Sequence, residues 1–446
     1  MKDPVTRQVA GGPSMLLDLH AANPNRYPAL LASAATSTAL GQFDILFAFP
    51  GERVTLLPDE RHSSSFLSRL DDRWKLEQTV SSETRLPFHG GWLVYLSYEL
   101  AVEVEPRLKL PPAKGPVALA MRIPAAVIYE HATQSCWLIA EPDQESKLQM
   151  IEEDISNLAT LPESKRDLLT GEIDEDPPEQ YLRAVERALA YIEAGDIYQA
   201  NVSRGWRARL NAEVKPTDIY RRLRQSNPGP FSALAQFDDL AVISSSPERL
   251  VSVRHGYIST RPIAGTRPRG KDLAADRELI SELSSNLKER AEHIMLLDLE
   301  RNDLGRVCAA GSVEVDEFMT IESYAHVHHI VSNVRGRLRA DVTPGQALAA
   351  VFPGGTITGC PKVRCMEIIA ELEGVPRGAY TGSLGYLNRD GSMDFNILIR
   401  SLEVRGEHVS LRAGAGIVAD SIPQRELDEA RAKARGVLNA LTGVRS

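Results

Sequence analysis

Two carboxylates and an ammonium near the C-terminus are spaced so that they share one face of a helix. Glu426, Glu429 and Lys433 stand at positions i, i+3 and i+7, after a glycine-containing loop predicted at 414–420. A separate face packs through Leu427, Ala430 and Ala434. A hard divalent cation prefers carboxylate ligands, and backbone N–H groups beside a glycine loop can bind an anion. The spacing therefore predicts a site for a metal and an anionic small molecule; the alternative is a solvated surface face.

A second acidic pair stands on another predicted helix. Residues 279–299 follow a helical period, and Glu289 and Glu292 lie opposite its apolar stripe at i, i+3. This stripe consists of Ile280, Leu283, Leu287, Ala291, Ile294 and Leu297. Two acidic helix faces can hold one Mg²⁺ between them, each giving one carboxylate directly and one through water.

The overall composition excludes several classes of function. The 446 residues are 43% hydrophobic, enough for a large core and for two or three domains, and the net charge is -9. This charge argues against a nucleic-acid or anionic-membrane partner. No stretch of 18 apolar residues is present, and residues 1–10 lack a signal-peptide pattern. The four cysteines show no paired spacing, so reduced thiols in a cytoplasmic protein are expected.

Two segments of the sequence differ in pattern. Residues 1–150 mix short strand-like runs with proline-rich turns, and residues 175–446 carry helices and strands; the charged stretch 141–180 is the expected boundary. A helix is predicted from an N-cap at Asp176 to a stop at Gly195, followed by a strand at 198–210 with period-two alternation. Strands are also predicted at 383–387, 395–404 and 408–412. Short turns between them require antiparallel neighbours.

A long series of motifs resembles one family of enzymes. The segment Ala-Glu-His-Ile-Met-Leu-Leu-Asp-Leu-Glu-Arg-Asn-Asp at 291–303 is similar to a signature of the chorismate-utilising enzymes. The resemblance covers roughly residues 175 to 440 and continues through the segments 246–249, 261–266, 326–332, 352–362 and 380–386. It implies an α+β fold in which antiparallel β-sheets form a sandwich-like core with surrounding helices.

The resemblance also implies a Mg²⁺ cofactor and a substrate pocket. By motif, Glu292 and Glu429 would bind the metal directly, with Glu289 and Glu426 supporting through water. The metal would neutralise the ring carboxylate of chorismate. Further contacts to the substrate would come from Tyr380 and Arg400 at the enolpyruvyl carboxylate, from the backbone at Ala415 and Gly416, and from Gly265, Thr266, Thr356 and Lys433.

Two further residues would take part in the chemistry. The resemblance places His329 near the ring carboxylate and the leaving oxygen, and makes Glu248 the general acid that protonates the departing C4 hydroxyl. Taken singly, His329 could equally be a hydrogen-bonded core histidine, Arg400 a surface cation and Glu248 a turn residue. A non-catalytic scaffold that keeps the fold without the chemistry is the remaining alternative.

Three positions distinguish the branches of the family. Members that add water resemble the segment around Gln199 but have a lysine there as base, so glutamine favours addition of ammonia. Ala264 replaces the nucleophilic lysine of many aminodeoxychorismate synthases and resembles anthranilate synthases. The motifs Asp-Phe-Asn-Ile at 394–397 and Pro-Phe-Ser-Ala at 230–233 resemble the corresponding segments of aminodeoxychorismate synthase component I. We therefore expect 4-amino-4-deoxychorismate as product, for folate synthesis, with anthranilate as the alternative.

The resemblance implies partners and a second ligand. The sequence has no glutaminase signature, so ammonia is expected from a separate glutamine amidotransferase subunit. Residues 26–33 resemble a tryptophan-contacting segment, which makes Ser33, Pro230 and Phe231 candidates for a tryptophan site. Ala32 departs from the usual glutamate or histidine of that segment.

Overall fold

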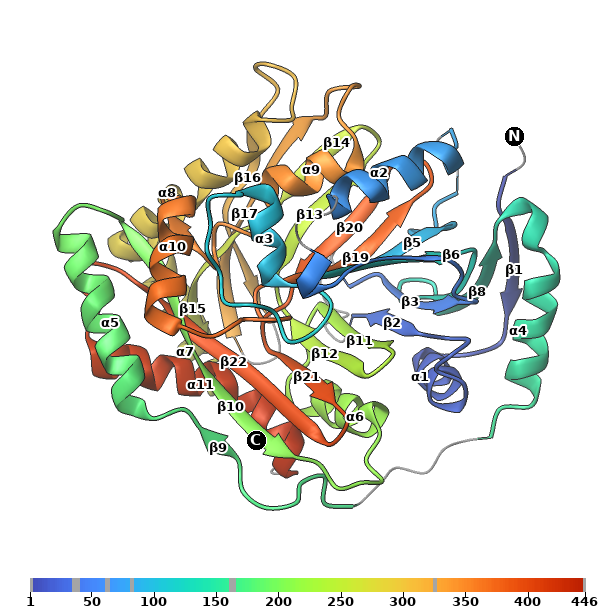
Figure 1. Ribbon diagram of the computed structural model, residues 1–446, viewed down its shortest axis with the longest axis horizontal. Coiled ribbons are helices and arrows are strands. Elements are labelled where there is room, and N and C mark those ends of the chain that lie inside the picture. Colours follow the sequence, from blue (N-terminus) through green and yellow to red (C-terminus); the bar gives the residue numbers. More distant parts are fainter. Residues whose placement is uncertain are drawn as a thin grey trace.

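The chain forms two antiparallel β-sheets, of twelve and ten strands, which pack face to face with helices around them (Figure 1). The structure is a computed structural model that describes residues 3–33, 41–60, 65–80, 84–159, 166–323 and 327–443. The expected α+β sandwich is confirmed. No helix in these ranges is both long and apolar enough to cross a membrane.

The first sheet runs, in spatial order, through β1 (Val5–Val9), β8 (Ser135–Ala140), β7 (Ala125–Glu130), β3 (Phe43–Ala48), β2 (Ala29–Ala32), β11 (Phe231–Phe237), β12 (Leu240–Ser246), β21 (Ser401–Arg405), β22 (His408–Ile417), β10 (Gln199–Arg209) and β18 (Gly359–Cys360), with β9 (Asp174–Glu175) paired to β10. The second runs through β15 (Ile263–Pro268), β17 (Val327–Arg337), β14 (Tyr257–Thr260), β13 (Arg249–Arg254), β20 (Met393–Ile397), β19 (Ser383–Asn388), β5 (Gly91–Leu96), β6 (Ala118–Ile123) and β4 (Arg53–Leu56), with β16 (Glu314–Ser323) paired to β17.

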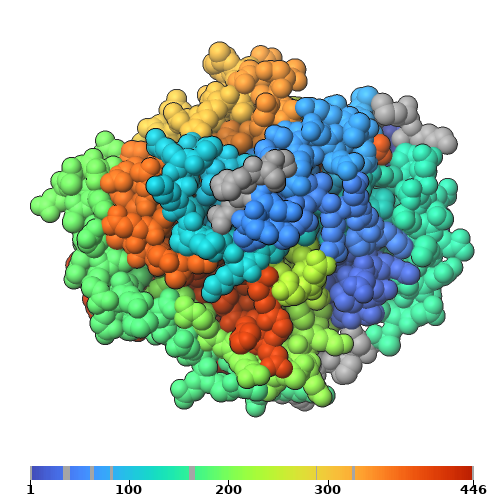
Figure 2. All heavy atoms as spheres, in the orientation of Figure 1, coloured from blue at the N-terminus to red at the C-terminus, as the bar shows by residue number. Residues whose placement is uncertain are grey.

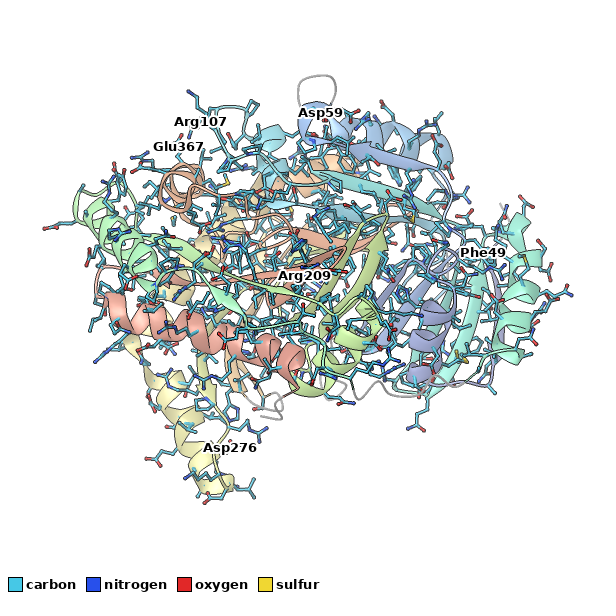
Figure 3. The ribbon with its side chains drawn as sticks, turned by 60° about the horizontal axis from the view of Figure 1, so that its bottom comes forward. Phe49, Asp59, Arg107, Arg209, Asp276 and Glu367 are labelled. Atoms are coloured by element: carbon cyan, nitrogen blue, oxygen red, sulfur yellow. The ribbon has the colours of Figure 1, made fainter. Side chains whose placement is uncertain are left out.

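The helices are α1 (Pro13–Ala22), α2 (Phe66–Glu77), α3 (Ala101–Val104), α4 (Ser146–Ser156), α5 (Pro178–Glu193), α6 (Pro216–Ser226), α7 (Leu273–Ser285), α8 (Leu287–Gly305), α9 (Pro344–Val351), α10 (Lys362–Glu373) and α11 (Pro423–Thr442). Figure 3 shows α7, marked by the label of Asp276, projecting from the body of the molecule.

Both sheets contain strands from the two segments that the sequence separates. In the first sheet β2 pairs with β11, and in the second β5 pairs with β19. Figure 2 shows the early part of the chain, in blue and cyan, lying directly against the orange and red C-terminal part on one continuous face. The segments 1–150 and 175–446 therefore share their sheets and their core.

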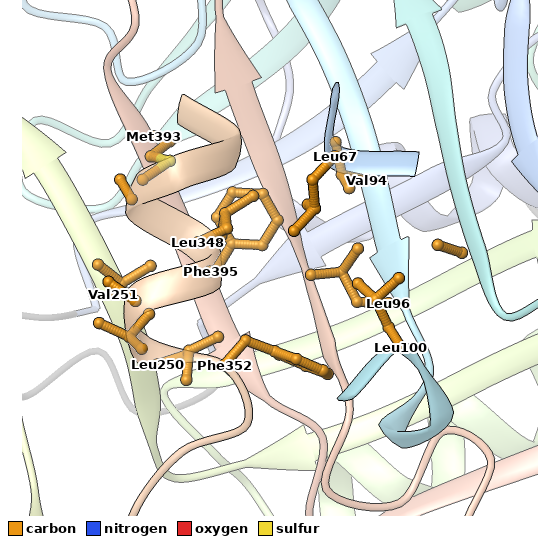
Figure 4. Close-up of a cluster of buried hydrophobic side chains, with 14 of the residues drawn as sticks. Leu67, Val94, Leu96, Leu100, Leu250, Val251, Leu348, Phe352, Met393 and Phe395 are labelled. Atoms are coloured by element: carbon orange, nitrogen blue, oxygen red, sulfur yellow. The ribbon is translucent and has the colours of Figure 1, made fainter. Parts of the chain in front are cut away.

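Strand β5 shows how the core is layered. Leu93 and Tyr95 point between the sheets, while Val94 and Leu96 point outward into a cluster under α2 and α9. That outer cluster, drawn in Figure 4, brings Val94 and Leu96 together with Leu348 and other apolar side chains. Because both faces of β5 are buried, its sequence is a continuous apolar run and does not alternate.

The single helix predicted at 279–299 is wrong. Two helices, α7 and α8, meet at Asn286, whose backbone is extended with ψ of 107°. The Asn286 Oδ1 atom accepts a hydrogen bond from the Glu289 N–H at 3.2 Å, as an N-cap residue of α8 does. Leu287 is 82% exposed and Ile294 46% exposed, so the predicted apolar stripe is not one packing face.

The strand predicted at 395–404 is also divided. Its first part belongs to β20 in the second sheet and its last part to β21 in the first sheet, so the chain crosses between sheets here. Arg400 stands at the crossing with φ of +52°, in the left-handed region. The turn places Arg400 in the wall of the candidate site.

Smaller differences concern helix and strand ends. Asp176 does not cap α5: its Oδ2 atom accepts the Gly205 N–H at 2.7 Å, and the N-cap position is Pro177. Gly195 follows α5 with φ of +79°, as its predicted stop. The glycine loop predicted at 414–420 begins as strand, because β22 continues to Ile417 in pairing with β10. Strand β10 is buried on both faces as far as Trp206, so its polar face is not solvated.

Candidate active site

A cavity of about 830 Å³ lies between α8, α11 and the ends of strands from both sheets. This volume is within the usual range of small-molecule sites. The lining includes most of the residues predicted from the sequence: Gln199, Ala264, Gly265, Thr266, Glu289, Glu292, His329, Thr356, Arg400, Gly416, Glu426, Glu429 and Lys433.

The four predicted metal ligands enter the cavity from two helices, Glu289 and Glu292 from α8 and Glu426 and Glu429 from α11. In the described parts of the chain, no three acidic, histidine or cysteine side chains are gathered closely enough to hold a metal ion. Two of the carboxylates form ion pairs with basic side chains: Arg267 Nη1 lies 2.6 Å from Glu289 Oε1, and Lys433 Nζ lies 2.7 Å from Glu429 Oε1. The chemistry of this all-carboxylate set fits Mg²⁺.

Gly265 brings strand β15 against the acidic helix. The register of β15 shifts between Ala264 and Thr266, and Gly265 takes φ of +67° at this irregularity. A Cβ atom at this position would lie 2.3 Å from Glu289 Oε2. Only glycine therefore allows both the backbone conformation and the present position of the Glu289 carboxylate.

His329 is buried in strand β17 and faces the cavity. Its Nδ1 atom lies 2.9 Å from Thr266 Oγ1 on the neighbouring strand. Burial, with the nearby Arg400 cation, lowers the pKa of His329 to about 4. The ring is thus neutral at physiological pH, and its contact with Thr266 fixes its orientation. From the sequence, His329 could be either a hydrogen-bonded core histidine or a residue of the site. The structure shows features of both, because the ring is buried and contacts Thr266 and also lines the cavity.

Arg400 supplies a positive charge to the cavity. Burial lowers the pKa of its guanidinium group, and the Glu248 carboxyl, which acts in the opposite direction, is the acid that faces it. Because the pKa of Glu248 is itself raised to about 7, this carboxyl neutralises the buried cation only in part near neutral pH, so the arrangement favours binding of an anion. Lys433 adds a second cation from α11, where its Nζ atom also donates to the Gly414 carbonyl at 3.2 Å.

Glu248 lies in the connection between β12 and β13, directly after the cavity-lining Pro247. Its side chain is buried, and this burial raises the pKa of the carboxyl to about 7. The Thr356 hydroxyl lies close enough to favour the ionised form, although it makes no hydrogen bond within the described residues. A carboxyl with this pKa can donate a proton near neutral pH.

Gln199 and Ala264 reach the cavity from β10 and β15. Gln199 is buried, and its amide packs on Gly416, where a Cβ atom would lie 2.8 Å from Gln199 Nε2. A neutral amide cannot act as the base that activates water. Ala264 offers no nucleophile beside it.

Three predicted residues lie outside the wall of the cavity. Glu248 is just behind it, and Ala415 is buried in an apolar cluster with Leu427. Tyr380 is also buried, where its hydroxyl donates to Asn201 Oδ1 at 3.4 Å, and burial raises its pKa to about 12. Tyr380 therefore reaches the cavity wall through Asn201, and its direct contact with a substrate stays a prediction.

The three residues predicted to bind tryptophan do not lie together in one cavity. Phe231 lines a second cavity of about 440 Å³, and Pro230 lines both this cavity and the larger one. Ser33 directly follows Ala32, which lines the second cavity, but is itself buried, with its N–H donating to Asp44 Oδ1 at 2.8 Å, and lines neither cavity. In the second cavity Arg249 makes two 2.9 Å hydrogen bonds to Asp394.

Several residues of the site were missed from the sequence. Asn201 lines the cavity two residues after Gln199 on the same strand face, and the period-two pattern could have included it. Arg267 holds Glu289, and Asn286 lines the cavity at the helix break. Arg377 is buried behind the wall and donates to the Asn201 carbonyl at 2.6 Å. Arg377 also forms an ion pair with Glu373, four residues before it, but its contact with Asn201 joins segments far apart in sequence and no local pattern marks that contact.

Proteins of known family are similar to this chain in sequence and in fold. Residues 28–439 match the family described as chorismate binding enzyme. The chain is 44% identical to an anthranilate synthase component I-like protein of Synechocystis sp., over 91% of this chain and 84% of that protein. It is 42% identical to aminodeoxychorismate synthase component 1 of Bacillus subtilis, over 82% and 80%.

A solved structure agrees with these relatives. The crystal structure of anthranilate synthase component I from Streptococcus pneumoniae has a TM-score of 0.79 and 30% identity, covering 90% of this chain and 93% of that one. The menaquinone-specific isochorismate synthase MenF of Escherichia coli, with a TM-score of 0.73 and 19% identity over 98% and 95%, shows the same fold. Through its sequence, its fold and the cavity that gathers its motifs, the chain belongs to the family of chorismate binding enzymes.

Proposed function

We propose that the chain transfers ammonia to chorismate, replacing the C4 hydroxyl to give 4-amino-4-deoxychorismate and water. The observation that carries amination is the buried Gln199 amide at the cavity wall, where water-adding members have a base. The choice of product is supported by the sequence motif Asp-Phe-Asn at 394–396 and by the Bacillus subtilis relative. We place the reaction in the cytoplasm.

The cations of the cavity would hold the substrate. Chorismate is a dicarboxylate, and Arg400 can pair with one carboxylate through two parallel hydrogen bonds. Lys433 lies in the same cavity, and neutral His329 can hydrogen-bond to the ring substituents without adding charge. These contacts would fix the ring with its C4 hydroxyl toward Glu248.

Glu248 would then donate its proton as the C4–O bond breaks, so that the hydroxyl leaves as water. Ammonia forms the new C–N bond at C4, either directly or after another nucleophile has visited C2. Ala264 cannot be that nucleophile. Changing Glu248→Gln should reduce kcat by roughly 100-fold or more, since proton donation would be lost.

Mg²⁺ would be held by Glu292 and Glu429, with Glu289 and Glu426 binding through water, and would neutralise the ring carboxylate. Glu292→Ala or Glu429→Ala should abolish Mg²⁺-dependent turnover. Asp428→Ala provides a matched control, since Asp428 lies on the same helix but outside the cavity, with its carboxylate accepting from Gln424. Unchanged turnover in the Glu292 and Glu429 variants would remove them from the metal site.

Anthranilate synthesis is the second candidate, favoured by Ala264 and by the Synechocystis and Streptococcus proteins. In that reaction ammonia adds at C2, the C4 hydroxyl leaves, and pyruvate is then eliminated. Chromatography of the products from purified chain, chorismate, Mg²⁺ and ammonium distinguishes the two. 4-Amino-4-deoxychorismate is expected; anthranilate with pyruvate would replace our choice of product.

A separate glutamine amidotransferase subunit would supply the ammonia. The isolated chain should then use ammonium and should not use glutamine; turnover with glutamine alone would contradict this.

The second cavity, with Pro230 and Phe231, is the proposed tryptophan site. Isothermal titration calorimetry with tryptophan measures binding to this site, and the absence of binding heat would reject the proposed site.

A further inference from the structure

Glu300 is a buried carboxyl that the proposed chemistry does not use. It lies on α8, only 6% exposed, and its Oε1 atom faces the Gly355 turn, 3.2 Å from where a Cβ atom would stand at that glycine. The Gly355 N–H and the Lys362 ammonium from α10 both favour the ionised form of this carboxyl. Lys362 also forms an ion pair with Asp303, one turn after Glu300 on α8. Glu300 thus lies beside the turn that carries Thr356.

Glu248 lies near the same turn. Thr356 follows Gly355 directly, and its hydroxyl is near the Glu248 carboxyl. The Ile263 N–H and the Lys433 ammonium also face Glu248, and so does Arg400. These neighbours favour an ionised Glu248, which could not donate a proton. Glu300 is the negative group that opposes them.

We propose that Glu300 is a positioning residue: from beside the Gly355–Thr356 turn, its buried carboxyl acts on Glu248 and keeps that residue in its proton-donating form. The inference rests on the proposed role of Glu248 as acid. It holds for either amine product, because both reactions lose the C4 hydroxyl.

The balance of charges supports this role. The pKa of each carboxyl is raised to about 7, chiefly by burial and in part by a neighbouring acid, which is Glu300 for Glu248 and Asp303 for Glu300. Lys362 and the Gly355 N–H favour the ionised form of Glu300. Two such carboxyls titrate as a pair, and an ionised Glu300 leaves the proton on Glu248.

The test is the pH dependence of kcat/KM for chorismate in Glu300→Gln, with free ammonia held constant at every pH. Activity needs protonated Glu248, so it falls as pH rises through the pKa of that group. Removing the Glu300 charge lowers the pKa of Glu248, and this basic limb should move to lower pH, on the order of one unit. The variant should therefore recover activity in more acidic buffer.

Two variants separate this effect from a loss of structure. Glu99→Gln is the matched control, because Glu99 is equally buried, has a pKa raised to about 7 and lies outside the cavity; its limb should stay in place. Glu300→Asp keeps the charge and should stay closer to the wild-type limb than Glu300→Gln. If Glu300→Gln does not fold, Glu300→Ala removes the same charge with a smaller side chain, and its limb should move to lower pH in the same way.

The outcomes are distinct. A limb that stays in place or moves to higher pH in Glu300→Gln overturns the inference, as does an equal shift in Glu99→Gln. Absence of chorismate consumption by the wild-type chain would instead defeat the proposed function. Consumption with a basic limb that Glu300→Gln leaves unmoved would defeat only the role of Glu300.

Discussion

At Gly265 a single methyl group would decide where the Glu289 carboxylate can lie. We expect Gly265→Ala to raise the Mg²⁺ concentration for half-maximal turnover roughly 10-fold or more, because the new Cβ displaces a supporting carboxylate. The positive φ adds about 1–2 kcal/mol of strain. Titration of turnover with Mg²⁺ measures the first effect.

Gly256 provides the control for this substitution. It has φ of +76°, but a Cβ atom there would meet nothing within 4 Å. Gly256→Ala should therefore show the strain as a lower melting temperature and keep the Mg²⁺ dependence of the wild type. Equal Mg²⁺ dependence in the two variants would show that Glu289 does not support the metal.

His329 links the cavity to stability in acid. Its folded pKa of about 4 lies below its ordinary value of 6.5, so the unfolded chain binds more protons between these values. The stability that neutral His329 contributes is present above pH 6.5 and is lost as pH falls toward 4. From pH 7.5 to 4.5 the wild type should lose about 2 kcal/mol more than His329→Gln. Urea denaturation at both pH values measures this, and equal losses would contradict it.

At the scale of elements, the break between α7 and α8 positions the acidic pair. Asn286→Ala removes the side chain that caps the first turn of α8, where Glu289 lies. We expect a loss of about 1 kcal/mol in stability and a weaker response to Mg²⁺. Denaturation and metal titration measure the two effects.

Asp272 is the matched control for this cap. Its carboxylate accepts the N–H groups of Ala274 and Ala275 at 2.9 Å and caps α7, which carries no predicted metal ligand. Asp272→Ala should lose a similar stability without changing the Mg²⁺ response. A change in both variants would mean that α7 itself, and not the α8 cap, sets the metal site.

For the whole molecule, the shared sheets predict that residues 175–446 do not fold alone. Without β2 and β5, strands β11 and β19 each lose a paired neighbour, and the inner core loses Leu93 and Tyr95. The isolated segment should show no cooperative thermal transition by circular dichroism. Co-expression with residues 1–160 should restore one. A cooperative transition in the fragment alone would show an independent domain.

Local patterns predicted much of the fold, and they identified acidic side chains that the structure brings to one cavity. Apolar spacing located α5 and α11, short turns indicated the antiparallel pairs β19–β20 and β21–β22, and acidic spacing identified the pairs on α8 and α11. The break at Asn286 was missed because the helical period continues through it. The crossing at Arg400 was missed because an apolar run gives no sign of a change of sheet.

Residue types and their spacing, which the sequence alone determined, gave the two acidic pairs as predicted metal ligands, because such spacing belongs to a side chain and its neighbours within one or two turns. The resemblance to the family, also carried by the sequence, made Gln199 and Ala264 the positions that distinguish its branches. Only the tertiary structure decided that the buried Arg400 guanidinium faces Glu248, that Arg267 holds Glu289, and that Glu300 lies near Glu248. Charge and burial at these positions come from segments far apart in sequence, and only folding brings them together.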